Sequence, residues 1–512
     1  MSKKVYLTGI LAILLLSFIL RVYDLSNNPP GFFSDEAAIG YNAYKILQTG
    51  KDEYGNPFPI FFRSFGDYRL PVPIYANIPF IALFGLSEFG VRFTAVFYGL
   101  ISILFIILIA SEIFGKNTGL LAGMLTGILP WHIHMSRWGA EYIYFPALLS
   151  IGLYLFLRSF RKESLLVYAF IFFGLSLYTY YAALIVIPLL VLFSLIVWLV
   201  KKQLFSRQVI TKSLIIFSLI CVPIFFGIKS GILLTRWKSI DNPPKALNES
   251  FYQMLITYVN HYSPDFLFLK GDADFKGHFV TRHSVRGFGE LYLFQLPLLM
   301  IGLITMLMKK KDPRIYLILF LLLIYPTGNA IALEGPFATK SIVGVIPFSI
   351  ISALGLSKVL DLIMQFNNKA FKMGIAIIIF GYITVSLAGY CQALFKEYPI
   401  YSANYWGWQY GPKTIISYLL KERNNYDELY FSGDFNGPDI FLKFYDPEGE
   451  CNNCKLGGID DYSPKKKQLF SIRVEALNEA KSKNIMLEFK RIKTIYYPGG
   501  SEAFYIGEAQ FL

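Results

Sequence analysis

The 512-residue sequence is poor in charged residues and in cysteine. Only 16% of it is Asp, Glu, Lys or Arg, against about 25% in typical soluble domains. Four cysteines in so long a chain exclude a disulfide scaffold. With 54% hydrophobic and 17% aromatic residues, the composition also excludes a disordered protein and an ordinary cytosolic enzyme. The mean hydropathy of +0.47 instead indicates a membrane protein.

Long apolar runs are plentiful. A membrane span needs about 20 mainly apolar residues, and eleven segments are candidates. They are residues 5–20, 91–111, 118–135, 141–157, 165–181, 183–200, 213–229, 291–308, 315–331, 341–357 and 373–392. A tyrosine cluster, which favours the membrane interface, divides the long run 165–200. The first segment is expected to be an uncleaved anchor, because no small-residue cleavage site precedes Arg21.

The net charge of +13 follows from this topology. With the N-terminus in the cytoplasm and alternating spans, the inner segments hold 17 of the 48 basic residues and 4 of the 35 acidic ones, which leaves 31 of each elsewhere. The basic excess thus lies in short inner loops, as the positive-inside rule predicts, and no nucleic-acid surface is needed to explain it. An odd number of spans places the C-terminus outside the cell membrane.

The long polar segments then share the outer face. They are residues 21–90, 230–290 and 393–512. This asymmetry predicts that the chemistry takes place at the extracytoplasmic surface. It argues against an ATP-driven machine, which would need an inner nucleotide-binding domain, and the sequence contains no GxxxxGK[ST] loop.

The first outer segment begins with a Pro-Pro-Gly turn at residues 29–31 and continues into a helical pattern from Ser34 or Asp35. The apolar stripe of this pattern is Ile39, Ala43, Ile46 and Leu47. It predicts a helix that lies in the membrane interface and ends at a Gly50 cap.

The acidic pair Asp35-Glu36 at the start of this helix has two interpretations. Both residues could cap the helix and compensate its dipole. Alternatively, a carboxylate at the membrane surface could act as general base towards an acceptor hydroxyl, or as a metal ligand. Adjacent helical positions point about 100° apart, so the two acids are expected to have different tasks.

A second acid–base element, Asp67-Tyr68-Arg69, precedes a Pro-rich re-entry into an apolar helix at about 74–86. Arg69 and Asp67 stand where they could meet lipid phosphates. The alternative is an ordinary surface ion pair in a turn, which would contribute little energy.

At these residues the sequence resembles the GT-C membrane glycosyltransferases, of the family 39 and aminoarabinose-transferase type that includes the protein O-mannosyltransferases. The resemblance rests on four elements and covers residues 1–390 in layout. The four elements are Asp35-Glu36, Asp67–Arg69, Gly90-Val91-Arg92-Phe93 and Met135-Ser136-Arg137-Trp138-Gly139-Ala140-Glu141. One departure is Arg69-Leu70-Pro71, which replaces a Lys-Pro-Pro element; a guanidinium binds phosphate in a bidentate manner, whereas an ammonium acts as a point charge.

The resemblance implies an all-α polytopic membrane domain and sugar transfer from a polyprenyl- or dolichyl-phosphate donor. It implies that Asp35 is the catalytic carboxylate, and that Glu36, Asp67 and Arg69 occupy positions that bind metal, acceptor or donor phosphate. Whether a divalent metal ion binds at Glu36 or Asp67 is left open. The spacing of the histidines does not identify a metal site.

Further candidates lie near the outer ends of later spans. Arg137 could contact the donor phosphate with Glu141 as its orienter; the alternative is an aromatic belt with interfacial polar groups. Arg282 and His283 could contact phosphate or acceptor, because they return towards the membrane before the eighth span. Lys340 is either a further phosphate ligand or an interface anchor.

Residues 393–512 differ in composition from the membrane domain, residues 1–392, and predict a small extracytoplasmic α/β domain. Its expected helices are 412–423 and 474–483, and its expected strands are 428–431, 485–489 and 504–506. Cys451 and Cys454 are expected to form a local disulfide. The domain shows no catalytic motif, so the site is expected to be complete within residues 1–340.

The sequence therefore predicts a glycosyltransferase of the cell membrane that uses a polyprenyl-phosphate sugar and an unidentified glycan, lipid or protein acceptor. A transporter or flippase of lipid-linked glycans is the alternative, although internal repeats and mid-membrane polar segments, typical of transporters, are not evident. A receptor that reads the envelope through its C-terminal domain is a third hypothesis.

Overall fold

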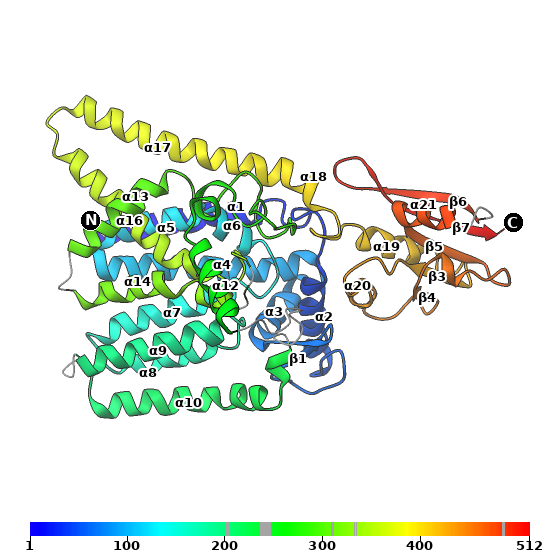
Figure 1. The fold of residues 1–512 in the computed structure, drawn as a ribbon, viewed down its shortest axis with the longest axis horizontal. Helices are drawn as coiled ribbons and strands as arrows, with labels where there is room; N and C mark the ends of the chain where they lie inside the picture. Colours follow the sequence, from blue (N-terminus) through cyan, green and yellow to red (C-terminus); the bar gives the residue numbers. More distant parts are fainter. Residues whose placement is uncertain are drawn as a thin grey trace.

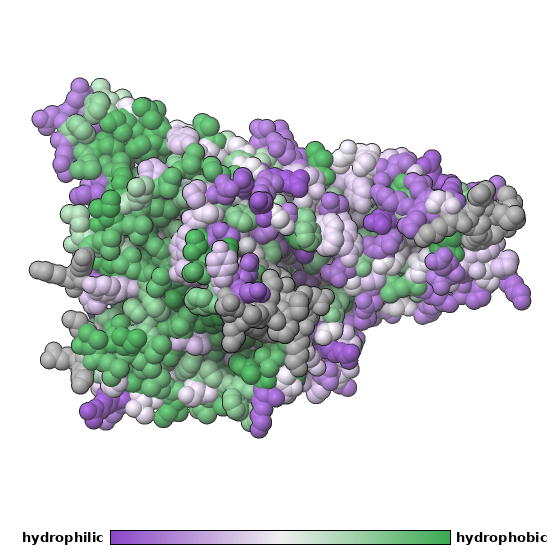
Figure 2. Space-filling view, viewed as in Figure 1, coloured by the Kyte–Doolittle hydropathy of each residue, from purple (hydrophilic) through white to green (hydrophobic). Residues whose placement is uncertain are grey.

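The computed structural model describes residues 1–200, 205–235, 247–308, 312–331, 333, 335–483 and 487–511. Its helices form an elongated bundle with a small mixed domain at one end, and the N-terminus lies at the opposite end (Figure 1). The surface over the bundle is largely hydrophobic, whereas the small domain is largely hydrophilic (Figure 2). The basic residues 201–202 and 309–311, used above in the charge argument, lie outside the described residues.

Helices coincide with each predicted span, and two of the spans, 118–135 and 315–331, are each divided into two helices. Seven helical segments of the described chain are long and apolar enough to cross a membrane. These are α1 (Lys3–Val22), α4 (Glu88–Phe114), α9 (Ala183–Val200), α10 (Arg207–Lys229), α14 (Pro313–Ile324) with α15 (Thr327–Ala330), α16 (Val345–Met364) with its preceding turn, and α17 (Lys369–Gln392) with α18 (Tyr398–Ser402). Four apolar helices are shorter: α3 (Pro71–Phe84), α7 (Tyr144–Ser159), α8 (Leu165–Ser176) and α13 (Gln295–Met308). The chain is an integral membrane protein, and the count of eleven spans stays a prediction.

Breaks between helices follow from local sequence. The predicted span 118–135 is divided into α5 (Lys116–Ile128) and α6 (Pro130–Ser136). Pro130 has no N–H to continue α5 and is the first residue of α6. The predicted division of the run 165–200 is confirmed, since α8 ends at Ser176 and α9 begins at Ala183.

The first outer segment forms α2 (Ser34–Thr49), which ends at Gly50 with φ +70° as expected of a glycine cap. A hairpin follows that the sequence did not predict, β1 (Phe62–Ser64) with β2 (Asp67–Arg69). The expected interfacial stripe is wrong in part: Ile39, Ala43 and Ile46 are buried in protein, and only Leu47 is exposed. This stripe packs on other helices of the chain and not on lipid. A further outer helix, α12 (Leu247–Asn260), lies later in the chain.

The C-terminal domain is α/β, as predicted. Its sheet has the order β4-β3-β5-β7-β6, in which β3 is parallel to β4 and β5, and β7 is antiparallel to β5 and β6. The elements are α19 (Pro412–Glu422), β3 (Glu428–Phe431), α20 (Asp439–Tyr445), β4 (Cys454–Leu456), β5 (Gln468–Arg473), α21 (Val474–Lys483), β6 (Leu487–Tyr496) and β7 (Glu502–Phe511). Of these, α20, β4 and β5 were not predicted. The Cys451–Cys454 disulfide is present.

The C-terminal domain and α2 share one hydrophobic core. Apolar side chains of α2, α3, α19, α20 and β3 belong to a single buried cluster. Two ion pairs connect the domain to the first outer segment: Lys443 Nζ lies 2.8 Å from Glu53 Oε2, and Lys413 Nζ lies 3.1 Å from Glu88 Oε2. The helix that carries Asp35 is therefore held partly by the C-terminal domain, and the expectation of a site complete within residues 1–340 stays a prediction.

Gly40 tests this shared core. A Cβ at Gly40 would lie 2.6 Å from Val91 Cγ2 and 2.8 Å from Phe444 Cε2, so a larger side chain would separate α2 from α4 and α20. We expect Gly40→Leu to destabilise the fold by about 1–3 kcal/mol through overpacking, which differential scanning fluorimetry in detergent would measure. Gly374→Leu on α17 is the control, since nothing lies within 4 Å of its Cβ position. Equal melting temperatures for the two variants would contradict the shared core.

Candidate active site

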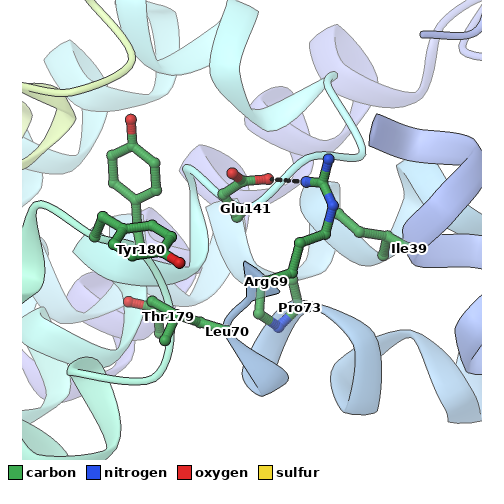
Figure 3. Close-up of a pocket in the computed structure, with 8 residues that line it drawn as sticks. Ile39, Arg69, Leu70, Pro73, Glu141, Thr179 and Tyr180 are labelled. Carbon is green, nitrogen blue, oxygen red and sulfur yellow. Dashed lines mark hydrogen bonds and ion pairs between the residues drawn. The ribbon is translucent and has the colours of Figure 1, made fainter. Parts of the chain in front are cut away.

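Asp35, Arg69 and Glu141 form one cluster near α2, at the end of the bundle that carries the C-terminal domain. Arg69 Nη2 forms an ion pair with Asp35 Oδ1, and Arg69 Nη1 lies 3.1 Å from Glu141 Oε2 (Figure 3). The side chains of Asp35 and Arg69 are 20% and 14% exposed, so the cluster is partly open to solvent. The structure thus brings together three predicted site residues that are far apart in sequence.

The β1–β2 hairpin positions Arg69. Its guanidinium Nε donates to Ser64 Oγ at 3.0 Å across the hairpin, and the Tyr181 hydroxyl donates to the Tyr68 carbonyl at 2.6 Å from the loop between α8 and α9. Arg69 and Glu141 line a small pocket with six further residues, most of which Figure 3 shows: Ile39, Leu70, Pro73, Thr179, Tyr180 and Tyr181.

Glu36 is buried and paired with Arg92. Arg92 Nε donates to Glu36 Oε1 at 3.0 Å and Nη2 donates to Oε2 at 3.2 Å, with both side chains 0% exposed. The backbone N–H groups of Gly139 and Phe33 donate to the same carboxylate at 2.9 and 3.1 Å. Burial raises the pKa of the Glu36 carboxyl, and the Arg92 guanidinium opposes that rise. With four donors already on its oxygens, Glu36 orients the start of α2.

Asp67 does not pair with Arg69 in the described structure. It accepts instead from the Thr235 hydroxyl at 2.5 Å and from the backbone N–H of Tyr68 at 2.7 Å. Glu36 and Asp67 therefore do not converge on a common position. Among the described residues no group of three or more His, Cys, Asp or Glu side chains could hold a metal ion, and a metal role for Glu36 or Asp67 stays open.

Arg137 is 1% exposed and donates to backbone carbonyls. Its Nη1 lies 2.9 Å from the Arg21 carbonyl and 2.8 Å from the Tyr23 carbonyl, and its Nη2 lies 2.5 Å from the Asn28 carbonyl. A guanidinium at the C-terminal end of α1 satisfies orphan carbonyls and complements the helix dipole. The predicted pairing of Arg137 with Glu141 is wrong, because Glu141 pairs with Arg69.

Arg282, His283 and Lys340 lie in a second, adjacent cluster. The Arg282 guanidinium lies over the Phe33 ring at 3.9 Å, next to the start of α2, and the Lys340 ammonium lies over the Phe337 ring at 4.7 Å. Burial lowers the pKa of Arg282, while Tyr142 and then Asp35 act in the opposite direction. This places Arg282 within electrostatic reach of the Asp35 carboxylate.

Sequence reasoning missed two residues of this region. Arg92 was noted only as part of the resemblance, although an ionisable residue at the start of an apolar span is a signal of function or of a buried partner. Asp272, which holds His278 and His283, carried no signal, because its partners lie 6 and 11 residues further along an irregular loop.

Comparisons with known proteins agree with this architecture. Residues 70–225 match the family model described as dolichyl-phosphate-mannose-protein mannosyltransferase. A search of curated proteins gave no significant match. The solved structure of ArnT from Cupriavidus metallidurans in the apo state aligns with a TM-score of 0.58 at 12% identity, over 98% of this chain and 97% of that one.

Two further structures align over most of the chain. ArnT from the same organism bound to undecaprenyl phosphate gives a TM-score of 0.55 at 12% identity, over 99% of this chain and 98% of that one. The oligosaccharyltransferase AglB from Archaeoglobus fulgidus, in complex with an inhibitory peptide and a dolichol-phosphate, gives 0.52 at 18% identity, over 82% of this chain and 58% of that one.

The chain has the GT-C fold. At these identities the structural likeness establishes the fold, and the glycosyltransferase family match within it covers the helices from α3 to α10. Together they confirm the resemblance to GT-C glycosyltransferases of the ArnT and protein mannosyltransferase type. Asp35 and Glu36 lie on α2, at the end of the bundle that packs against the C-terminal domain.

The Glu36–Arg92 pair yields a stability prediction. Arg92→Met would leave a buried carboxylate without its cation, which typically costs about 3–5 kcal/mol, so we expect a large fall in the detergent melting temperature. Glu36→Gln combined with Arg92→Met should recover part of this loss. The control is Arg286→Met, which removes a half-exposed ion pair with Asp274 and should cost about 1 kcal/mol or less. A melting temperature of Arg92→Met equal to that of Arg286→Met would contradict the role of the pair.

Proposed function

We propose that the protein transfers a sugar from a polyprenyl-phosphate carrier to an acceptor at the extracytoplasmic face of the cell membrane, with Asp35 as general base. The observation that carries this proposal is the Asp35–Arg69–Glu141 cluster, which is partly exposed at the outer end of a GT-C fold. ArnT of this fold has been solved with undecaprenyl phosphate, and AglB with a dolichol-phosphate. These support a lipid-linked donor here.

The proposed reaction is a displacement at the anomeric carbon. The Asp35 carboxylate takes the proton of the acceptor group as that group attacks, and the polyprenyl phosphate leaves with the electrons of the broken C–O bond. Cations aimed at the leaving phosphate would stabilise the charge that develops on it. Arg69 stands beside Asp35, and Arg282 Nη2 has no hydrogen-bond partner among the described residues, since only its Nη1 donates to carbonyls, so both are suited to this task. Lys340 is the third candidate.

Other predicted residues take supporting roles in this proposal. Glu141 orients Arg69 through their ion pair. Glu36 and Arg137 fix the backbone from which α2 begins, and Asp67 holds the β1–β2 hairpin against Thr235.

The proposed orientation places the N-terminus in the cytoplasm and the C-terminal domain outside. The charge asymmetry of the loops supports it. The structure supports it as well, since the N-terminus and the C-terminal domain lie at opposite ends of the bundle (Figure 1). The Cys451–Cys454 disulfide suits an oxidising compartment.

Asp35→Asn tests the assignment. We expect sugar transfer to fall by about 100-fold or more, because the amide cannot accept the proton. Transfer is measured with a panel of polyprenyl-phosphate sugars, by mass spectrometry of the released carrier. The control is Asp265→Asn, which removes an exposed ion pair with Lys270 and should keep full turnover. Both variants should melt near the wild-type temperature. Normal turnover by a folded Asp35→Asn variant would refute the role of Asp35.

A further inference from the structure

Asp272 is a buried acid that contacts two imidazole rings. Its carboxylate is 0% exposed and accepts from the backbone N–H of Ala338 at 2.6 Å. His278 Nδ1 lies 3.0 Å from Asp272 Oδ1, and His283 Nδ1 lies 3.4 Å from Oδ1 and 3.3 Å from Oδ2. The general-base role of Asp35 makes no use of this cluster.

The contact with Asp272 determines the tautomer of His283. A carboxylate accepts hydrogen bonds, so the nitrogen that faces it, Nδ1, carries the proton, and Nε2 is left with its lone pair. No described residue forms a hydrogen bond with His283 Nε2, and the side chain is 13% exposed. The ring is fixed by stacking on Trp138, with the two centroids 6.0 Å apart, and by an edge contact with Phe337. His283 is thus a rigidly held imidazole with one open nitrogen.

His283 lies among the cations assigned above to the donor phosphate. Arg282 precedes it in the chain, and the Arg282 carbonyl accepts from His134 Nε2 at 2.6 Å, which anchors this loop to α6. Burial lowers the pKa of His283, Asp272 opposes that effect, and Arg282 and Lys340 lower it further. The imidazole is therefore neutral while the site holds no anion.

Further titratable groups surround Asp272 and His283: His134 and His261 lie within electrostatic reach of Asp272, and His134 also of His283. Asp272 stays ionised, because the two histidines lower its pKa against the effect of burial. The acid that faces Asp272 from the other side is Glu290, whose pKa burial raises well above its ordinary value and which accepts from the Asp272 backbone N–H. The monoanionic phosphodiester of the donor, placed near Arg282 and Lys340, would reduce the positive field that favours neutral His283, and the second charge that develops as the C–O bond breaks would reduce it further.

We propose that His283, held by Asp272, is the proton donor to the departing phosphate. The inference rests on the proposed function. When the donor binds, the imidazole takes up one proton at Nε2 from the buffered solvent. As the anomeric C–O bond breaks, its electron pair goes to the phosphate oxygen, the acceptor proton goes to Asp35, and His283 Nε2–H passes its proton to the phosphate. Polyprenyl monophosphate leaves as the monoanion, and His283 returns to the neutral form.

Proton uptake on product binding tests this assignment without turnover. Titration calorimetry of the full-length protein with polyprenyl monophosphate, in buffers of different ionisation enthalpy at pH 7, counts the protons bound. We expect the wild-type protein to take up about one proton more than His283→Gln. The matched control is His278→Gln, which removes the other imidazole on Asp272 and should keep the wild-type count. Equal counts for wild type and His283→Gln would overturn the proposal, as would a loss confined to His278→Gln.

The pH profile of turnover gives a second test. The active form requires a protonated His283, so wild-type kcat should fall as pH rises through the pKa of His283 in the donor complex. His283→Gln should lack this alkaline fall and show kcat roughly 10- to 100-fold lower at pH 7, with KM within about threefold. If Asp35→Asn is inactive but His283→Gln keeps the alkaline fall, the proton-donor role of His283 is refuted and the proposed function is not affected. Full activity of Asp35→Asn would instead remove the proposed function itself.

Discussion

The buried ion pair between Glu36 and Arg92 is the interaction on which the outer face of this protein depends. Two unscreened charges in an apolar interior are expensive, and the cost is offset only when every polar atom is matched. Arg92 also donates to the carbonyls of Leu25, Pro29 and Gly31, so one guanidinium fixes the whole turn that leads into α2. The first residue of α2 and the direction of Asp35 follow from it.

The rest of the site is built around α2 from both sides. Inside the bundle, α4 supplies Arg92 and the contact with Gly40. On the outside, α20 packs on the same glycine through Phe444, so the helix lies between the membrane domain and the C-terminal domain. This explains how a domain without catalytic motifs contributes to chemistry: it holds in place a helix that a lipid interface would leave mobile. A 16-residue helix with a half-apolar surface would be only marginally stable alone.

The sequence predicted the features that depend on local pattern. Apolar runs located the helices, Gly50 located the end of α2, and the position of Asp35 followed from an acidic pair at a helix start. It did not predict contacts between distant segments. The pairing of Arg69 with Glu141 joins residues 72 positions apart, and Ile39 is buried in a cluster whose other members lie mostly far from it in sequence. An apolar stripe is the same whether lipid or protein covers it, so periodicity could not distinguish the two.

The arginines show why residue type alone could not assign the phosphate site. Arg137 and Arg282 both have partly apolar surroundings, and both lie near the ends of spans. The hydrogen-bonding groups of Arg137 are directed at backbone carbonyls of α1 and the turn after it, so recruiting it to a ligand would expose the end of that helix. Both arginines have a buried Nε without a hydrogen-bond partner among the described residues. Arg282 stacks on Phe33 and donates only from Nη1, to the carbonyls of Trp406 and Gly407, so its Nη2 could donate to an arriving anion while those bonds are kept. The hydrogen bonds that each arginine already makes to backbone carbonyls decide between them, and only the fold shows these bonds.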